Sequence, residues 1–392
     1  MRAVRAILVV CGVVLGLAPA AAASPGVGTP TVVTLGDSAI SGEAGRWAGN
    51  TNSHPARVDA LGSTAYWDTP TGEAIRGCHR SKSAEVHIGI KAINLACSGA
   101  RTYTNADGSD FKPGIDFYSD ASGRKGQARM LQEYAAGNNV RAVVLLIGAN
   151  NYGFADIVEA CVANWLTSPS WWKNYCNDDS GIRSRFTASR IATETANVKG
   201  AILNVNQAMV NAGYDAGQWT LLVQTYSSPI PRAAGFRYPE TGWTRQSIGG
   251  CGVWNRDADW AQDTVVSVFN STARTAATQS GLSNVKVIDM GGALNGRRLC
   301  ENTVGLLEEK GVANWRSAGA VDKSEWVSQI RTVTTLLPPY QLQEDGHPSY
   351  WGQLALRNCL RQAYNDGVPQ GGTCTIGGTG LNSLGEPVMA FG

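Results

Sequence analysis

The sequence predicts a three-layer α/β/α domain built on a parallel sheet of five strands. Five short apolar runs, rich in β-branched residues, are spread along the 392 residues, and segments with apolar residues at helical spacing lie between them. Near-continuous apolar runs are typical of parallel strands that are covered on both faces. Strands that alternate with helices favour this architecture. The chain is 43% apolar, which is enough to build a substantial core.

The expected strands are residues 31–35, 87–95, 142–147, 219–224 and 285–290. The expected helices are residues 127–136, 184–211, 260–279 and 351–364. The remaining segments, rich in Gly, Trp and polar residues, are predicted to be loops: 42–85, 101–124, 152–183, 227–255 and 296–342. Most of these loops follow the carboxyl end of a strand, where open α/β sheets build their sites.

The chain is interpreted as an export signal followed by one domain. Arg2 and Arg5 precede an apolar run, 6–17, and small residues, 18–23, so a signal peptide over 1–23 is expected with cleavage near Ala23. The alternative, a membrane anchor, needs roughly 20 apolar residues. No repeat or linker divides residues 24–392, and the Gly-rich tail from about 375 is expected to be a loosely held surface strip. We therefore expect a secreted protein.

Charge and cysteine content limit the function classes. The chain has 33 basic and 31 acidic residues, so it lacks the charge excess typical of proteins that bind nucleic acid or anionic membranes. Beyond Cys11, the chain holds eight cysteines, an even number that indicates disulfides in an exported protein. Sequence alone leaves many pairings open, and we predict pairing between neighbours: Cys78–Cys97, Cys161–Cys176, Cys251–Cys300 and Cys359–Cys374. A metal site is disfavoured because CxxC and CxxH spacings are absent.

Ser38 is a candidate nucleophile because it stands where the first strand turns toward a helix. A serine there projects its hydroxyl at the edge of the sheet, next to helix N–H groups that can stabilise an oxyanion. The alternative for Gly36-Asp37-Ser38 is an ordinary turn and helix cap. A serine nucleophile also needs a base, and His347 is the best of four histidines. Of the other three, His87 opens an expected strand and is interpreted as structural, while His54 and His79 lie in polar loops and are predicted to be at the surface.

His347 stands just before the last expected helix, with Glu344 and Asp345 three and two residues before it. One of these carboxylates could reach the imidazole and fix its tautomer. Two more strand ends could complete an oxyanion hole. Gly99 can bring its N–H close to a substrate oxygen because it has no Cβ, and Asn150 offers a side-chain N–H.

These residues resemble the four blocks of the SGNH (GDSL) hydrolase superfamily: Gly36-Asp37-Ser38, Gly99, Gly148-x-Asn150 and His347-Pro348. The last block, followed by Trp351-Gly352-Gln353, resembles that of exported actinobacterial esterases and lipases of this superfamily. The resemblance implies a flavodoxin-like fold without metal or organic cofactor. It also implies Ser38 as nucleophile, His347 as general base and acid, and an oxyanion hole formed by Ser38, Gly99 and Asn150.

Two departures from the family pattern bear on the site. Asn151 stands where the family often has aspartate. The slot of the triad acid holds Glu344, so we predict Glu344 as the acid, with Asp345 as the alternative and a backbone carbonyl as a third possibility. The predicted function is a secreted carboxylic ester hydrolase of lipase, esterase or phospholipase type. The alternatives are a carbohydrate acetyl-esterase and a non-catalytic binding protein. We expect a monomer acting on small-molecule, lipid or glycan esters, without nucleic acid or stable membrane insertion.

Overall fold

The computed structural model describes residues 25–107, 110–332 and 334–392. The predicted signal peptide, residues 1–23, lies outside these ranges and stays a prediction. Within them, no helix is both long enough and apolar enough to span a bilayer.

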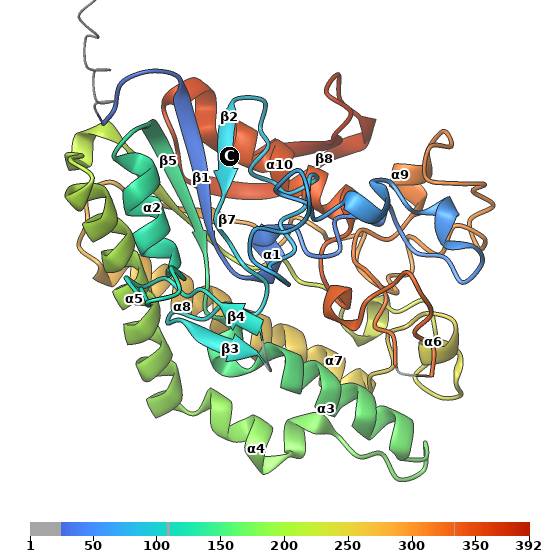
Figure 1. Cartoon of the computed structure of the whole chain (residues 1–392). Coiled ribbons are helices and arrows are strands. Elements are labelled where there is room, and N and C mark those ends of the chain that lie inside the picture. The colour runs from blue at the N-terminus through green and yellow to red at the C-terminus, as the bar shows by residue number, and fades with distance from the viewer. Residues whose placement is uncertain (1–24, 108–109, 333) are drawn as a thin grey trace, which may run out of the picture.

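The fold is organised around one sheet of seven strands in the order β2-β1-β5-β6-β7-β8-β9 (Figure 1). Six of these strands run parallel, and β9 is antiparallel to β8 at one edge. The first five in this order follow the arrangement of flavodoxin-like sheets, so the predicted fold class is confirmed. The strands are β1 (Pro30–Gly36), β2 (Lys91–Asn94), β5 (Asn139–Leu146), β6 (Thr220–Gln224), β7 (Val285–Asp289), β8 (Gly372–Leu381) and β9 (Pro387–Phe391).

Helices cover both faces of the sheet because successive strand residues point to opposite sides. Val33 and Leu35 of β1 are buried under α2 (Gln127–Ala135), α5 (Ala188–Asn211) and α8 (Ser267–Gln279). Val32, which precedes Val33, belongs to the core on the other face, which is packed under α10 (Tyr350–Tyr364). The four predicted helices are therefore present, although the third is split by a π-helical stretch, Ala261–Val266, that follows α7 (Asn255–Trp260).

Several segments differ from the sequence prediction. The sheet has seven strands rather than five, because the tail predicted as a loose strip forms β8 and β9, and β8 extends the sheet beside β7. The predicted loop 152–183 contains α3 (Phe154–Thr167), and the loop 101–124 contains a small hairpin. The remaining elements are α1 (Ser38–Ser41), β3 (Asn105–Asp107), β4 (Asp110–Lys112), α4 (Ser180–Arg183), α6 (Thr244–Ser247) and α9 (Ala320–Lys323).

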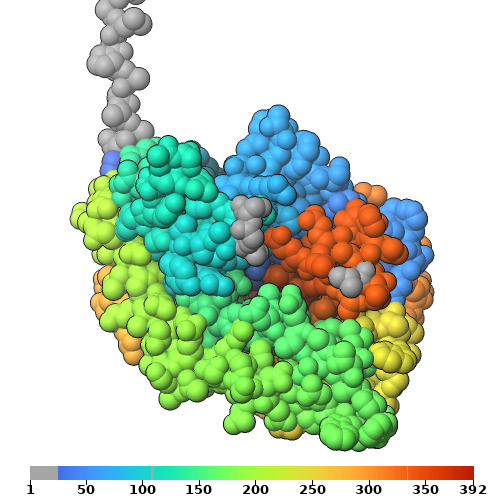
Figure 2. All heavy atoms as spheres, turned by 60° about the horizontal axis from the view of Figure 1, so that its bottom comes forward, coloured from blue at the N-terminus to red at the C-terminus, as the bar shows by residue number. Residues whose placement is uncertain are grey.

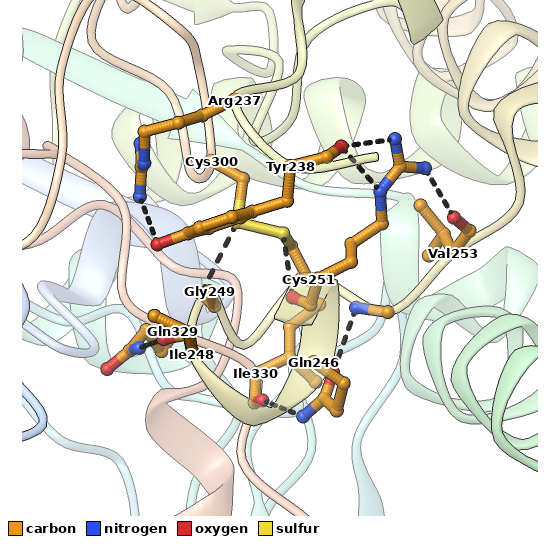
Figure 3. The surroundings of a disulfide bond; sticks show 12 residues. Arg237, Tyr238, Gln246, Ile248, Gly249, Cys251, Val253, Cys300, Gln329 and Ile330 are labelled. Carbon is orange, nitrogen blue, oxygen red and sulfur yellow. Dashed lines mark hydrogen bonds between the residues drawn. A yellow bond between two sulfur atoms is a disulfide. The ribbon is translucent and has the colours of Figure 1, made fainter. Parts of the chain in front are cut away.

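The eight cysteines pair as predicted. Neighbours in sequence are joined in four disulfides: Cys78–Cys97, Cys161–Cys176, Cys251–Cys300 and Cys359–Cys374. The last joins α10 to β8, and the third lies among loops whose backbone is tied by polar side chains (Figure 3). The disulfides therefore fasten long loops to the sheet and to one another.

We expect the chain without residues 1–23 to contain no free thiol, because all eight of its cysteines are paired. Thiol titration of the denatured, non-reduced protein should give a value near zero, and full reduction should release all eight thiols. Two or more titratable thiols per chain before reduction would contradict this pairing.

Candidate active site

The candidate nucleophile, Ser38, is placed by a close contact between β1 and β5. Gly36 has φ +143°, and a Cβ there would lie 2.0 Å from the carbonyl oxygen of Leu146. Only glycine fits this position, since any side chain would clash with the β5 backbone. The Asp37 N–H then donates to the same Leu146 oxygen at 3.1 Å. The turn is thus fixed against β5 immediately before Ser38.

Ser38 and His347 meet although 309 positions separate them in the sequence. His347 Nε2 lies 2.7 Å from Ser38 Oγ. On the other side of the ring, Nδ1 lies 3.0 Å from the backbone carbonyl of Asp345. A carbonyl only accepts, so this contact fits the tautomer with the proton on Nδ1 and a lone pair on Nε2. Burial lowers the pKa of His347 and so favours the neutral ring.

The residues predicted for an oxyanion hole line the same groove as Ser38 and His347. Asn150 Nδ2 donates to the Ala100 carbonyl at 2.9 Å, which uses one of its two hydrogens. Among the described residues, neither the Ser38 N–H nor the Gly99 N–H has a hydrogen-bond acceptor. Gly99 has φ +78°, a conformation that favours glycine. Three N–H donors are therefore available near one hydroxyl.

Asp37 belongs to a buried network that connects three strand ends. Its carboxyl accepts from the Tyr226 hydroxyl and, at 3.2 Å, from the Ala39 N–H. The Tyr226 oxygen in turn accepts from the Ala149 N–H at 3.1 Å. Burial raises the pKa of Asp37 to about 7 and the pKa of Tyr226 well above its usual value. Tyr226 was not singled out in the sequence; its position directly after the strand 219–224 was the available signal.

The prediction that the Glu344 carboxyl contacts His347 as its acid partner is wrong. Glu344 points away from the imidazole and accepts from the Tyr66 hydroxyl at 2.6 Å and from Trp47 Nε1 at 2.8 Å. It also accepts from the Gln341 N–H across a short 3₁₀ turn, 342–344. The physical reason is that this turn carries the side chain into a pocket of donors, which satisfy the buried carboxylate.

Asp345, the alternative acid, also fails to reach the ring through its side chain. Its Oδ2 accepts from the Arg331 N–H at 2.7 Å, while Oδ1 is buried without a partner among the described residues. Burial raises the pKa of this carboxyl to about 8, so it is mostly protonated at neutral pH. Its backbone carbonyl makes the contact with His347, which is the third possibility that the sequence left open.

A second buried histidine lies near this loop. His79, which the sequence predicts to lie at the surface, is instead 6% exposed, and its Nδ1 lies 2.7 Å from Glu43 Oε1. The ring stacks on Tyr66 with centroids 4.4 Å apart. Gln343 Nε2 donates to the other Glu43 oxygen at 3.1 Å. Glu43 therefore ties the residues before His347 to the loop that follows β1, and its negative charge partly opposes the lowering of the His347 pKa.

Asn151, the departure from the family pattern, is a structural support. Its Nδ2 donates to Glu194 at 2.8 Å and to the Thr102 hydroxyl at 2.7 Å, while its Oδ1 accepts from the Thr102 N–H. These bonds hold the loop after β2 beside the turn that carries Asn150.

Two cavities open at Ser38. A groove of about 500 Å³ runs along α3, and Figure 2 shows a hollow between the α3 side of the molecule and the segments near 340. A smaller cavity of about 60 Å³ lies beyond His347, among Phe154, Tyr226 and Phe269. The apolar residues of the groove are Phe154, Ala155, Val158, Val162, Ala163, Leu166, Ile330 and Leu342.

No protein-family model matches the chain, and no curated protein matches it. Solved structures with a similar arrangement include an extracellular lipase from Streptomyces rimosus, with 17% identity, TM-score 0.39, and coverage of 83% of this chain and 94% of that one. A phospholipase A1 from Streptomyces albidoflavus NA297 has 17% identity, TM-score 0.42, and coverage of 83% and 95%. A carbohydrate acetylesterase from Sinorhizobium meliloti has 12% identity, TM-score 0.32, and coverage of 72% and 94%. All three TM-scores are below 0.5.

The Asp345→Asn variant tests whether the side chain of this residue orients His347. Asp345→Asn keeps the backbone carbonyl that contacts His347, and an amide oxygen can still accept from the Arg331 N–H. We expect its acylation rate to stay within about threefold of wild type, whereas removal of a true triad acid costs about 10⁴-fold. Pre-steady-state acylation with a p-nitrophenyl ester measures this. A loss of more than about a hundredfold, at an unchanged Tm, would assign the orienting role to the side chain.

The matched variant is Glu344→Gln. An amide offers one acceptor oxygen where the carboxylate serves three donors, so we expect a loss of about 1–3 kcal/mol in the free energy of unfolding. The effect should be larger on Tm than on the acylation rate of the folded protein. Thermal denaturation and single-turnover kinetics on the same sample separate the two.

The protonation of His347 makes the activity depend on pH. The base must be neutral to accept the Ser38 proton, and burial lowers the pKa of His347, so activity should persist below the usual histidine pKa of about 6.5. The acidic limb of kcat/KM for a soluble ester should have its midpoint below that pH. Glu43→Gln removes a nearby negative charge and should move the limb lower still, while the surface variant Glu133→Gln should leave it in place. A midpoint above pH 7 would contradict this.

Proposed function

We propose that the chain is a secreted serine ester hydrolase of the SGNH type. The observation that carries the proposal is the juxtaposition at one groove of a hydroxyl, a neutral imidazole in contact with it, and three N–H donors. A turn or a helix cap explains Ser38 alone. It does not explain why His347, more than 300 positions away, presents Nε2 to that hydroxyl.

The proposed reaction has two steps. Ser38 Oγ attacks the ester carbonyl while His347 Nε2 takes the Ser38 proton, and the carbonyl oxygen becomes an oxyanion held by the N–H groups of Ser38, Gly99 and Asn150. His347 returns the proton to the departing alcohol, which leaves an acyl-serine. The imidazole then takes a proton from water, the hydroxide attacks the acyl carbon, and Ser38 regains its hydrogen as the acid is released.

The carbonyl of Asp345 would serve this reaction by orienting the ring. A hydrogen bond from Nδ1–H to this carbonyl keeps Nε2 directed toward Ser38. The carbonyl oxygen also stabilises the imidazolium that forms during the reaction. It supplies less electrostatic stabilisation than a carboxylate would, because the carbonyl carries a partial charge only. The proposed mechanism is therefore a serine–histidine dyad supported by the backbone.

The groove favours an acyl or lipid ester as substrate. Its α3 wall presents Ala155, Val158, Val162 and Leu166 at helical spacing, so an extended hydrocarbon chain can lie along one apolar stripe. Ile330 and Leu342 face this stripe from the other wall. A carbohydrate acetyl-esterase would need free polar groups that recognise sugar hydroxyls. Of the six polar residues that line the groove outside the proposed catalytic set, Gln343, Asp345 and Arg331 already bond within the protein.

The test is hydrolysis of p-nitrophenyl esters from acetate to palmitate, together with phosphatidylcholine and an acetylated xylan. We expect turnover that vanishes in Ser38→Ala and falls by about a hundredfold or more in Asn150→Ala, since the latter removes one oxyanion donor. Ser41→Ala is the matched control, because Ser41 is a neighbouring buried serine that bonds to the Ser38 carbonyl and lines neither cavity. An absence of turnover on every ester would support a binding protein instead. Preference for the acetylated xylan would favour the carbohydrate esterase.

A further inference from the structure

Three tryptophans are unusually exposed near one end of α3. The exposed fractions are 82% for Trp171, 73% for Trp172 and 64% for Trp243. We call these three residues the tryptophan patch. Exposed apolar groups gathered on one face of a soluble protein mark a surface that binds something. The site described above uses none of the three.

The two loops that carry the patch are fastened to each other. Trp243 packs edge-on against Trp165 of α3, with ring centroids 5.8 Å apart. Lys173, next to Trp172, pairs with Glu240, near Trp243. The rings of Trp171 and Trp172 also contact each other, with centroids 6.3 Å apart. In Figure 1 the carboxyl end of α3 lies next to α6, which begins directly after Trp243. The exposed rings thus stand on one rigid corner of the molecule.

This corner adjoins the far end of the groove that starts at Ser38. Leu166, the residue after Trp165, lines the groove from α3, and Ile330 lines it from the opposite wall. Gln246 donates from Nε2 to the Ile330 carbonyl at 2.8 Å (Figure 3). The Ile330 N–H donates to the Gly250 carbonyl at 2.7 Å. The loop of Trp243 is therefore joined to the groove wall. Val158, Val162 and Leu166 of α3 line the groove between this corner and the nucleophile.

The charges around the patch are neutralised within the protein. Lys173 pairs with Glu240, and Arg256 pairs with Asp178, in the segment between α3 and α7. The Arg245 guanidinium is buried and donates to the carbonyls of Tyr238 and Val253. This corner therefore offers apolar rings without a basic cluster, which suits a neutral or zwitterionic surface and not an anionic one.

We propose that the tryptophan patch docks the protein on a neutral lipid–water interface and presents the groove to lipid in that surface. Tryptophan is the side chain that best occupies such an interface, because its ring is apolar and its N–H is polar. The proposal rests on the proposed ester hydrolase function for its purpose, since docking would deliver an ester chain to Ser38. Docking itself needs no catalysis and is measured without it.

The experiment uses the Ser38→Ala chain, which binds without turnover, and sedimentation with phosphatidylcholine vesicles. We expect binding, with a blue shift of the tryptophan fluorescence. In that background, Trp171→Ala/Trp172→Ala/Trp243→Ala should lower the partition coefficient by about tenfold or more, because the apolar area that enters the interface is lost. The control is Trp67→Ala, since Trp67 is 41% exposed but lies outside the patch. Raising the salt concentration should change binding by less than about twofold.

Trp243 packs on Trp165, so its loss could loosen the corner. The double variant Trp171→Ala/Trp172→Ala keeps that contact and should still lower the partition coefficient by about threefold or more. The proposal is overturned if the Ser38→Ala chain does not bind the vesicles, if the triple variant binds as well as its parent, or if Trp67→Ala is equally impaired. Binding to insoluble xylan or cellulose that the triple variant loses, without vesicle binding, would make the patch a carbohydrate surface. The ester panel tests hydrolysis separately, so the two failures are distinguishable.

Discussion

The close approach of Gly36 to β5 is the constraint on which the site depends. With φ +143° and no room for a Cβ beside the Leu146 carbonyl, the chain must leave β1 in one direction. Gln127 of α2 fixes the same residue from the other face, because its side-chain amide both donates to the Gly36 carbonyl and accepts from the Gly36 N–H at 2.8 Å. A backbone held from two elements cannot relax by a few tenths of an ångström, so the position of Ser38 is set by the packing of the whole sheet.

Because the sheet fixes Ser38, the site also requires that His347 be held next to it. The loop that precedes α10 holds His347 there. The residues before His347 are held through their side chains: Glu344 by Tyr66 and Trp47, and Gln343 by Glu43. With the loop held in this way, the backbone carbonyl of Asp345 lies within hydrogen-bond distance of His347 Nδ1. The carboxylate predicted as a partner of the histidine thus acts one step away, by positioning the loop whose carbonyl makes the contact.

The sequence predicted the parts of the fold whose signals are local. The strands after which Ser38 and Asn150 stand are continuous apolar runs, and the glycine at the first of these ends is required by the contact with β5. The helix α3 was missed although Phe154, Ile157, Val158, Cys161, Val162 and Trp165 follow helical spacing, because its Trp and Gly neighbours suggested a loop. The strand β8 was missed because its glycine-rich sequence has low strand propensity, and pairing with β7 and β9 overrides it.

The identity of the orienting group was beyond sequence reasoning for a different reason. The Glu344 carboxyl, the Asp345 carboxyl and the Asp345 backbone carbonyl all belong to residues within three positions of His347. Spacing in the sequence cannot distinguish a side chain that turns toward the ring from one that turns away. The direction of the Glu344 side chain is decided by hydrogen-bond donors from distant parts of the chain. Tyr66 and Trp47, almost 300 positions distant, offer Glu344 two hydrogen bonds in a buried place. A buried carboxylate is more stable where several donors bond to it than where it accepts from one imidazole N–H. The Glu344 side chain therefore points toward Tyr66 and Trp47 and not toward His347. The neutral histidine has a different cause: burial lowers the pKa of His347 more than the nearby negative charge of Glu43 raises it. The Asp345 side chain adds little charge near the ring, because burial raises the pKa of its carboxyl to about 8.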